Sequence, residues 1–125
     1  MAYISNNIQD KLIKGTNSKD DIENWASNVT IDARAGNDYI YNDMSGPNTS
    51  INSGDGDDEI DNYAYNVKIE GGSGNDSIKS SGNKKTIDGG AGSDIISVSG
   101  NDLLIKYKSG DGNDTIYGFG DLDTL

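Results

Sequence analysis

The sequence predicts an all-β fold, a right-handed parallel β-roll (β-solenoid) of about seven 18-residue coils. Three observations lead to this prediction. Large aliphatic residues recur at a nearly constant step of nine residues, glycine-aspartate hexapeptides recur at about twice that step, and only 32% of the 125 residues are hydrophobic. So few apolar residues make a poor globular core, but stacked coils that share a narrow core need little more than one aliphatic residue per strand.

The aliphatic step runs the whole length of the chain. Eleven of its thirteen intervals are nine residues and two are eleven, which fits neither a helical stripe nor the alternation of a single strand. It fits half a coil, made of one short strand and one turn. Seven coils about 4.8 Å apart would form a rod ~34 Å long. The positions are Ile4, Ile13, Ile22, Ile31, Ile40, Ile51, Ile60, Ile69, Ile78, Ile87, Ile96, Tyr107, Ile116 and Leu125.

Tyr107, rather than Ile105, is expected at the twelfth of these positions. In the other coils the glycine-rich turn begins two residues after the aliphatic residue, as Gly71 follows Ile69, and Ser109 follows Tyr107 in the same way. Under this register both two-residue insertions fall on the edge of the rod opposite the glycine-rich turns. One of them contains Gly46-Pro47, which is a turn signal.

The hexapeptides belong to a nonapeptide that is clearest in residues 71–79, which read G-G-x-G-x-D-x-U-x with U a large aliphatic residue. Residues 89–97 repeat it, residues 53–61 and 109–117 lack only the first glycine, and residues 33–41 and 15–23 are weaker copies. Because the motif occurs in every second half-coil, all of its aspartates should lie on one edge of the rod. They are Asp20, Asp38, Asp58, Asp76, Asp94 and Asp114.

This edge is suited to calcium. Glycine adopts positive φ without steric cost and lets a tight turn direct its carbonyls inward, and six to eight carbonyl and carboxylate oxygens suit Ca²⁺ better than Mg²⁺. Aspartates stacked about 4.8 Å apart repel one another by roughly 1 to 3.5 kcal/mol. A cation between neighbouring turns would replace this repulsion with attraction and couple folding to metal binding. Four such ions would move the net charge from −11 to −3.

Several other classes of protein are disfavoured. The chain has no Cys and no His, which removes disulfides, thiolate sites and most zinc and histidine chemistry. Its acidic charge disfavours nucleic acid, and no apolar run is long enough for a membrane span. Asp55 and Asp111 begin runs that lack the glycine and glutamate of an EF-hand. The pair Asp57 and Asp58 fits metal ligation better than acid–base catalysis, so we do not expect an enzyme.

The repeats resemble the RTX family, the haemolysin-type calcium-binding repeats, over nearly all of the chain and most specifically from Ser53 to Tyr117. The resemblance implies a bacterial, secreted protein, such as a toxin, adhesin or extracellular enzyme, that leaves by type I secretion and folds outside the cell. It also implies three to five calcium ions in a row between successive motif turns. The implied metal-site residues are Asp38, Ser53, Asp55, Asp57, Asp58, Gly71, Ser73, Asn75, Asp76, Gly89, Ala91, Ser93, Asp94, Ser109, Asp111, Asn113 and Asp114.

We expect a single domain over residues 1–125, with degenerate N-terminal coils in 1–32, motif-bearing coils in 33–117 and a truncated final half-coil in 118–125. The sequence departs from the family pattern because the motif lies on one edge only. In addition, the first turn, Gly15–Asp20, lacks two glycines, and Arg34 occupies a glycine position. Whether the first turn binds calcium is left open. The chain stops inside an aliphatic repeat, so we expect a fragment of a larger protein.

The expected function is a calcium-dependent structural module that holds or presents covalently linked domains of its parent protein. The alternative is a calcium-supported polysaccharide- or surface-binding module of the adhesin type. Lys84, Lys85, Lys106 and Lys108 would offer its cationic surface, whereas Trp25 and the seven tyrosines are scattered in sequence and should mainly pack or cap the rod. Exposed strand edges at the ends of the rod predict end-to-end self-association.

Overall fold

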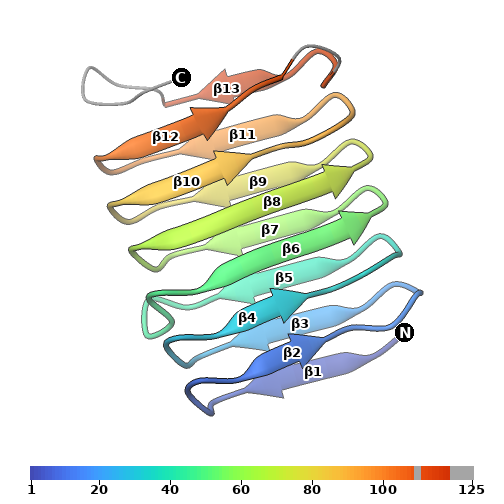
Figure 1. Cartoon of the computed structure of the whole chain (residues 1–125), viewed down its shortest axis with the longest axis vertical. Coiled ribbons are helices and arrows are strands. Elements are labelled where there is room, and N and C mark those ends of the chain that lie inside the picture. The colour runs from blue at the N-terminus through green and yellow to red at the C-terminus, as the bar shows by residue number, and fades with distance from the viewer. Residues whose placement is uncertain (109–110, 119–125) are drawn as a thin grey trace.

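The computed structural model describes residues 1–108 and 111–118, and this part of the chain contains strands and turns but no helix (Figure 1). It therefore has no helix that could cross a membrane. The strands are β1 Tyr3–Asn6, β2 Leu12–Lys14, β3 Asp21–Asn24, β4 Thr30–Asp32, β5 Tyr39–Asn42, β6 Ser50–Asp55, β7 Glu59–Asn62, β8 Val67–Ser73, β9 Ser77–Ser80, β10 Lys85–Asp88, β11 Ile95–Val98, β12 Leu103–Lys106 and β13 Thr115–Tyr117.

The strands form two parallel sheets that face each other. Odd-numbered strands make one sheet in the order β1-β3-β5-β7-β9-β11-β13, and even-numbered strands make the other in the order β2-β4-β6-β8-β10-β12. The chain alternates between the sheets, so each pair of strands with its two turns is one coil, and Figure 1 shows the coils stacked from β1 at one end to β13 at the other. The described residues thus make six coils and one strand of a seventh, which confirms the predicted parallel solenoid.

The core is a double column of isoleucines, one from the middle of each strand. Side chains alternate between the two faces of a strand, so the narrow space between the sheets receives every second residue. The pairing places the predicted aliphatic positions directly over one another, as in Ile22 over Ile40 and Ile69 over Ile87. Side chains exposed by 3% or less include Ile13, Ile22, Ile31, Ile40, Ile51, Ile60, Ile69, Ile78, Ile87 and Ile96.

The expected register of the last coils is wrong. In β12, Ile105 lies opposite Ile87 and is 2% exposed, whereas Tyr107 follows the strand and is 52% exposed. A shift of two residues preserves the alternation of inward and outward side chains, so burial decides between the two registers. The observed register buries Leu103 and Ile105, whereas the expected one would bury Ile105 and Tyr107. Burying the two aliphatic side chains is more favourable, because it buries no tyrosine hydroxyl. The second insertion is therefore Tyr107-Lys108, on the same edge as the glycine-rich turns, so the expectation that both insertions lie opposite these turns is wrong for this one. Leu125 lies outside the described residues.

The two kinds of turn lie on opposite edges of the roll. Turns that lead from an even strand to the next odd strand carry the glycine-aspartate hexapeptides, and we call this side the motif edge. Turns that lead from an odd strand to the next even strand form the plain edge. The insertion with Gly46-Pro47 lies on the plain edge, between β5 and β6, as predicted.

Candidate metal centre

The motif edge contains a continuous column of buried aspartates. Asp38, Asp58, Asp76 and Asp94 are 1–3% exposed although each sits in a turn. Each one accepts at Oδ1 the backbone N–H of the aspartate in the preceding turn, for example from Asp38 to Asp58 (2.7 Å) and from Asp58 to Asp76 (2.9 Å). The same bond joins Asp94 to Asp114 over 3.0 Å. One oxygen of every carboxylate thus ties two coils together.

The second oxygen of these carboxylates has no protein partner. Oδ2 of Asp38, Asp58, Asp76 and Asp94 is buried and makes no hydrogen bond. A buried, unpaired carboxylate oxygen is costly and calls for a proton or a cation. The residues present therefore fit a hard cation such as Ca²⁺, whose ligands are oxygens.

The electrostatics of the column lead to the same conclusion. Burial, with added repulsion from neighbouring carboxylates, raises the pKa of Asp38 to about 6 and that of Asp76 to about 7. Burial also raises the pKa of Asp58 and Asp94. Without a metal, the ionised form of these carboxylates is thus disfavoured near neutral pH. A cation on Oδ2 would favour the ionised form and lower the pKa values again.

The glycines allow consecutive turns to approach closely. Gly72 and Gly74 have φ values of 99° and 122°, and a Cβ on either would overlap the carbonyl oxygen of Gly54 or Gly56 in the preceding turn. Hydrogen bonds join these turns, including Gly74 N–H to the Ala91 carbonyl over 2.8 Å. The turns thereby form a close stack of backbone carbonyls beside the carboxylates. The described residues contain no group of three acidic side chains suited to a metal, so a cation here would depend on these carbonyls.

The first turn differs from the others in its hydrogen bonding. Asp20 is fully buried, but Thr16 donates its backbone N–H to Oδ2 (2.5 Å) and its hydroxyl to both oxygens (2.8 and 3.0 Å), and Ala2 N–H reaches Oδ1 (2.6 Å). Burial alone would raise the pKa of Asp20, but these donors lower it below its ordinary value. The protein therefore supplies hydrogen-bond donors to both carboxylate oxygens of Asp20, whereas Oδ2 of the four aspartates above has none.

The structure separates the predicted site residues into an inner and an outer group. Buried in the inner group are Asp38, Ser53, Asp58, Gly71, Asp76, Gly89 and Asp94. Side chains on the outside of the turns are Asp55, Asp57, Ser73, Asn75, Ala91, Ser93 and Asn113, whereas Asp111 and Asp114 are half-buried. Ser109 lies outside the described residues.

The outer group forms a ladder that includes one residue that the sequence analysis missed. Asn37 accepts the N–H of Asp57 (3.1 Å), Asp57 accepts that of Asn75 (2.8 Å), and Asn75 accepts that of Ser93 (2.8 Å). The signal was present, because the fifth position of these turns is always Asn, Asp or Ser. These side chains link the turns from outside and leave the interior to the carboxylate column.

The plain edge contains a second buried column, made of asparagines, which the sequence analysis also missed. Asn6, Asn24, Asn42 and Asn62 are 0–3% exposed, and each amide donates to the oxygen of the next over 2.8 Å as far as Asn62. The Nδ2 atoms also donate to turn carbonyls, for example from Asn24 to Ala26 (2.8 Å). The signal was an asparagine two residues after Ile4, Ile22, Ile40 and Ile60.

A lysine takes over where the asparagine column ends. Asn62 donates to the hydroxyl of Ser80 (3.0 Å), and Ser80 has no amide with which to continue. Lys85, which is 3% exposed, instead donates its ammonium group to the carbonyls of Gly82 and Ser99. Gly82 corresponds to Ala64 in the preceding coil, whose carbonyl accepts from Asn62 (3.0 Å). The lysine thus replaces the missing donor.

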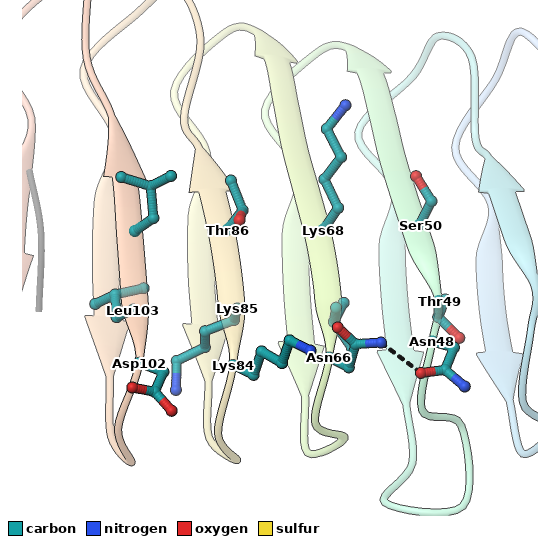
Figure 2. Close-up of a pocket in the computed structure, with 12 residues that line it drawn as sticks. Asn48, Thr49, Ser50, Asn66, Lys68, Lys84, Lys85, Thr86, Asp102 and Leu103 are labelled. Carbon is teal, nitrogen blue, oxygen red and sulfur yellow. Dashed lines mark hydrogen bonds between the residues drawn. The ribbon is translucent and has the colours of Figure 1, made fainter.

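The predicted cationic surface does not include Lys85. Figure 2 shows a shallow groove beside the plain edge, lined by Asn48, Asn66, Lys84, Lys85 and eight further residues of the even-numbered strands and the turns before them. Lys84 is exposed in it, but the ammonium of Lys85 is bound to backbone carbonyls. Beside Lys84, Asn66 donates to the exposed Asn48 (2.5 Å).

These features define a class of protein: a parallel β-solenoid with one edge that is hydrogen-bonded without a ligand and one edge of stacked glycine turns, in which four carboxylates each leave one oxygen without a partner. A family model described as the RTX calcium-binding nonapeptide repeat matches four copies in this chain, over residues 26–44, 70–104 and 108–125. These segments make up more than half of the sequence, so the chain belongs to the RTX calcium-binding repeat family. Comparison with curated proteins and with solved structures gives no match.

Proposed function

We propose that this chain is a calcium-dependent structural module of a larger, secreted bacterial protein, and that residues 1–125 form one folding unit. The family is that of a calcium-binding repeat module. The observation that carries the proposal is the set of four buried Oδ2 atoms without partners, one in each turn from Asp38 to Asp94. Without a cation, the motif edge keeps unpaired, mutually repelling oxygens.

The ligands of each ion would be the carboxylates of the aspartate column and the carbonyls of neighbouring motif turns. The turns at residues 53–58, 71–76, 89–94 and 109–114 would supply most of them, with the turn at 33–38 at one end. Three to five ions would bind in a row, and the four unpartnered carboxylates favour four. The satisfied carboxylate of Asp20 argues against a further site in the first turn.

The function of such a module follows from the coupling of binding and folding. A chain whose stack closes only with calcium would stay unfolded where calcium is scarce and would fold where calcium is abundant, as after export from a cell. Once folded, the rod would hold its neighbouring domains at a fixed separation. The adhesin-type alternative loses part of its support because Lys85 is not on the surface.

The test is far-UV circular dichroism during a Ca²⁺ titration of the chelated protein, with Mg²⁺ as the control. We expect β-structure to appear with calcium and not with magnesium, and expect Asp76→Ala with Asp94→Ala to abolish most of the response. A matched control is Asp10→Asn with Asp102→Asn on the plain edge, which should respond like the unmodified chain. A chain that is fully β-structured in chelator and indifferent to calcium would contradict the proposal.

A further inference from the structure

The outer face of the odd-numbered sheet carries an alternating pattern of carboxylates and aromatic rings. Along the roll, Asp21, Tyr39 and Glu59 occupy one row of paired positions, and Glu23, Tyr41 and Asp61 occupy the next. A third row, one residue beyond the asparagine column, is Trp25, Asp43 and Tyr63. These nine residues, which we call the acidic-aromatic face, contain five carboxylates and neither lysine nor arginine.

Hydrogen bonds and ring contacts hold this face in order. The hydroxyl of Tyr39 donates to Asp61 (3.1 Å) and that of Tyr41 to Asp43 (3.2 Å). The ring of Tyr41 lies between those of Trp25 and Tyr63, with centroid distances of 5.4 and 5.6 Å. The expectation that the aromatic residues are scattered is therefore wrong for this group. The bond from Tyr39 occupies Oδ2 of Asp61 and leaves its Oδ1 available to a ligand. Asp43 is occupied at both oxygens, because Ser45 also donates its backbone N–H (2.9 Å) and its hydroxyl (2.5 Å) to Oδ2.

The same sheet changes character in the later coils. On β9 and β11 the corresponding outward positions are Ser77 and Lys79, then Ile95 and Ser97, with no carboxylate among them. The carboxylates of the face are thus confined to β3, β7 and the residue that follows β5. Tyr3 of β1 lies opposite Asp21 and donates its hydroxyl to Glu23 (2.9 Å), so the aromatic pattern extends to β1. Trp25 and Tyr63 keep 43% and 41% of their surface exposed, so the face is accessible among the described residues.

We propose that the acidic-aromatic face binds an extended basic segment of a partner protein, with its arginine or lysine side chains over the rings and between the carboxylates. Cations stack on aromatic faces, and arginine pairs with carboxylates through two hydrogen bonds. The carboxylates of β3 and β7 lie two coil steps apart, about 10 Å, on either side of the tyrosines of β5. Successive outward positions on one strand repeat every ~6.7 Å, which matches alternate side chains of an extended peptide.

The pattern favours a basic peptide over a polysaccharide. Sugar rings stack on aromatic side chains that present their flat faces side by side, whereas here the neighbouring rings are tilted by 48° and 46°. Five carboxylates, with one lysine, Lys79, opposite Asp61 at the border of the face, would also repel acidic polysaccharides. Charge complementarity therefore identifies the partner as cationic.

The test uses the only tryptophan of the chain, Trp25, as an intrinsic fluorescence probe. The protein is held in saturating calcium, with folding verified by circular dichroism, so that failure to fold is distinguished from failure to bind. A synthetic nine-residue peptide of alternating arginine and serine is then titrated. We expect a saturable change in fluorescence at physiological salt.

Matched variants separate this face from the general charge of the protein. Glu23→Gln with Asp61→Asn keeps acceptors for the tyrosine hydroxyls and should weaken peptide binding about tenfold. Asp21→Asn with Glu59→Gln should act in the same way. The control, Asp10→Asn with Asp102→Asn, removes the same charge at two exposed plain-edge positions and should change affinity less than about twofold. Asparagine already occupies the equivalent left-handed conformation at Asn28, Asn48 and Asn66.

Three outcomes would overturn the proposal. The first is equal weakening by all three variants, which would mean attraction by net charge alone. The second is the absence of a saturable signal from the folded protein. The third is a fluorescence response to a neutral glucan hexamer but not to the peptide, which would make the face a sugar-binding surface.

Discussion

The two edges of the roll solve the same structural problem with different chemistry. On the plain edge, the amides of Asn24 and Asn42 both donate and accept, so the column is complete without any ligand. On the motif edge, carboxylates such as Asp58 and Asp76 accept at one oxygen and leave the other unpaired. We therefore expect the plain edge to close without a ligand and the motif edge to close when a cation binds. In the proposed account, the exchange of amides for carboxylates is what makes the motif edge depend on calcium.

The largest effect is expected from a break in the closed edge. Asn42→Ala removes hydrogen bonds to Asn24, Asn62 and the Gly46 carbonyl in a buried position and should lower the free energy of unfolding by about 2–4 kcal/mol. Urea denaturation should show the same loss at every calcium concentration at which the unmodified chain is folded. Asn52→Ala, on the exposed face of β6, is the control and should cost less than about 0.5 kcal/mol. A loss at Asn42 that calcium repairs would contradict the division between the edges.

A repair of the plain edge tests the role of Lys85. Lys85→Val should cost about 2–3 kcal/mol because the carbonyls of Gly82 and Ser99 lose a charged donor. The preceding coil has Asn62 and Val67 at the positions of Ser80 and Lys85. Adding Ser80→Asn to Lys85→Val gives this coil the same two residues and should restore most of that stability in thermal denaturation. If the double variant is no more stable than Lys85→Val, the lysine does not substitute for an asparagine.

A smaller loss of stability is expected in the first motif turn, where a substitution should make a turn that needs no cation depend on calcium. Thr16→Ala removes the hydroxyl that donates to both oxygens of Asp20 and should cost about 1–2 kcal/mol at low calcium. Added calcium should recover part of this loss, because the turn then resembles those that follow it. Asn17→Ala in the same turn is the control. A loss that is equal at low and high calcium would mean that Thr16 acts only on the shape of the turn.

The last prediction concerns pH. In the metal-free protein, Asp38 and Asp76 have pKa values raised to about 6 and about 7 by burial, so the folded state binds more protons than the unfolded state between about pH 4 and 7. Stability without calcium should therefore fall as the pH rises through this range, by at most about 1.4 kcal/mol per pH unit for each proton.

Calcium reverses the direction of this dependence. Since protons compete with the cation for the same carboxylates, the apparent calcium affinity should fall as the pH falls below about 7. Titrations at pH 6 and pH 8 check both statements. Calcium binding that is equally strong at the two pH values would show that the raised carboxylates are not the ligands.

The fold could be predicted from the sequence because its period is regular. The nine-residue step of isoleucines gave the coil and the core, and the 18-residue step of the aspartates placed them on one edge, as the structure confirms. The register near Ile105 failed because a two-residue shift keeps the alternation and only burial distinguishes the two solutions.

The asparagine column shows a different limit of sequence reasoning. Asn24 and Asn42 recur as regularly as the aspartates, but asparagine is common in exposed turns, and its burial depends on neighbouring coils that donate and accept in turn. The role of Thr16 was hidden for a related reason. Its turn looks degenerate in sequence, and only the geometry shows that a hydroxyl replaces an external ligand.

The most direct test replaces the carboxylates of the motif edge with the amides of the plain edge. Asp58→Asn with Asp76→Asn keeps the Oδ1 acceptors and places an amide donor where each Oδ2 lacks a partner. The quantity to measure is the fraction of β-structure in chelator, by far-UV circular dichroism, beside that of the unmodified chain. We expect the variant to be more folded in chelator and less responsive to calcium. A variant that is less folded in chelator than the unmodified chain would contradict the conclusion that the motif edge differs from the plain edge by its unpaired carboxylates.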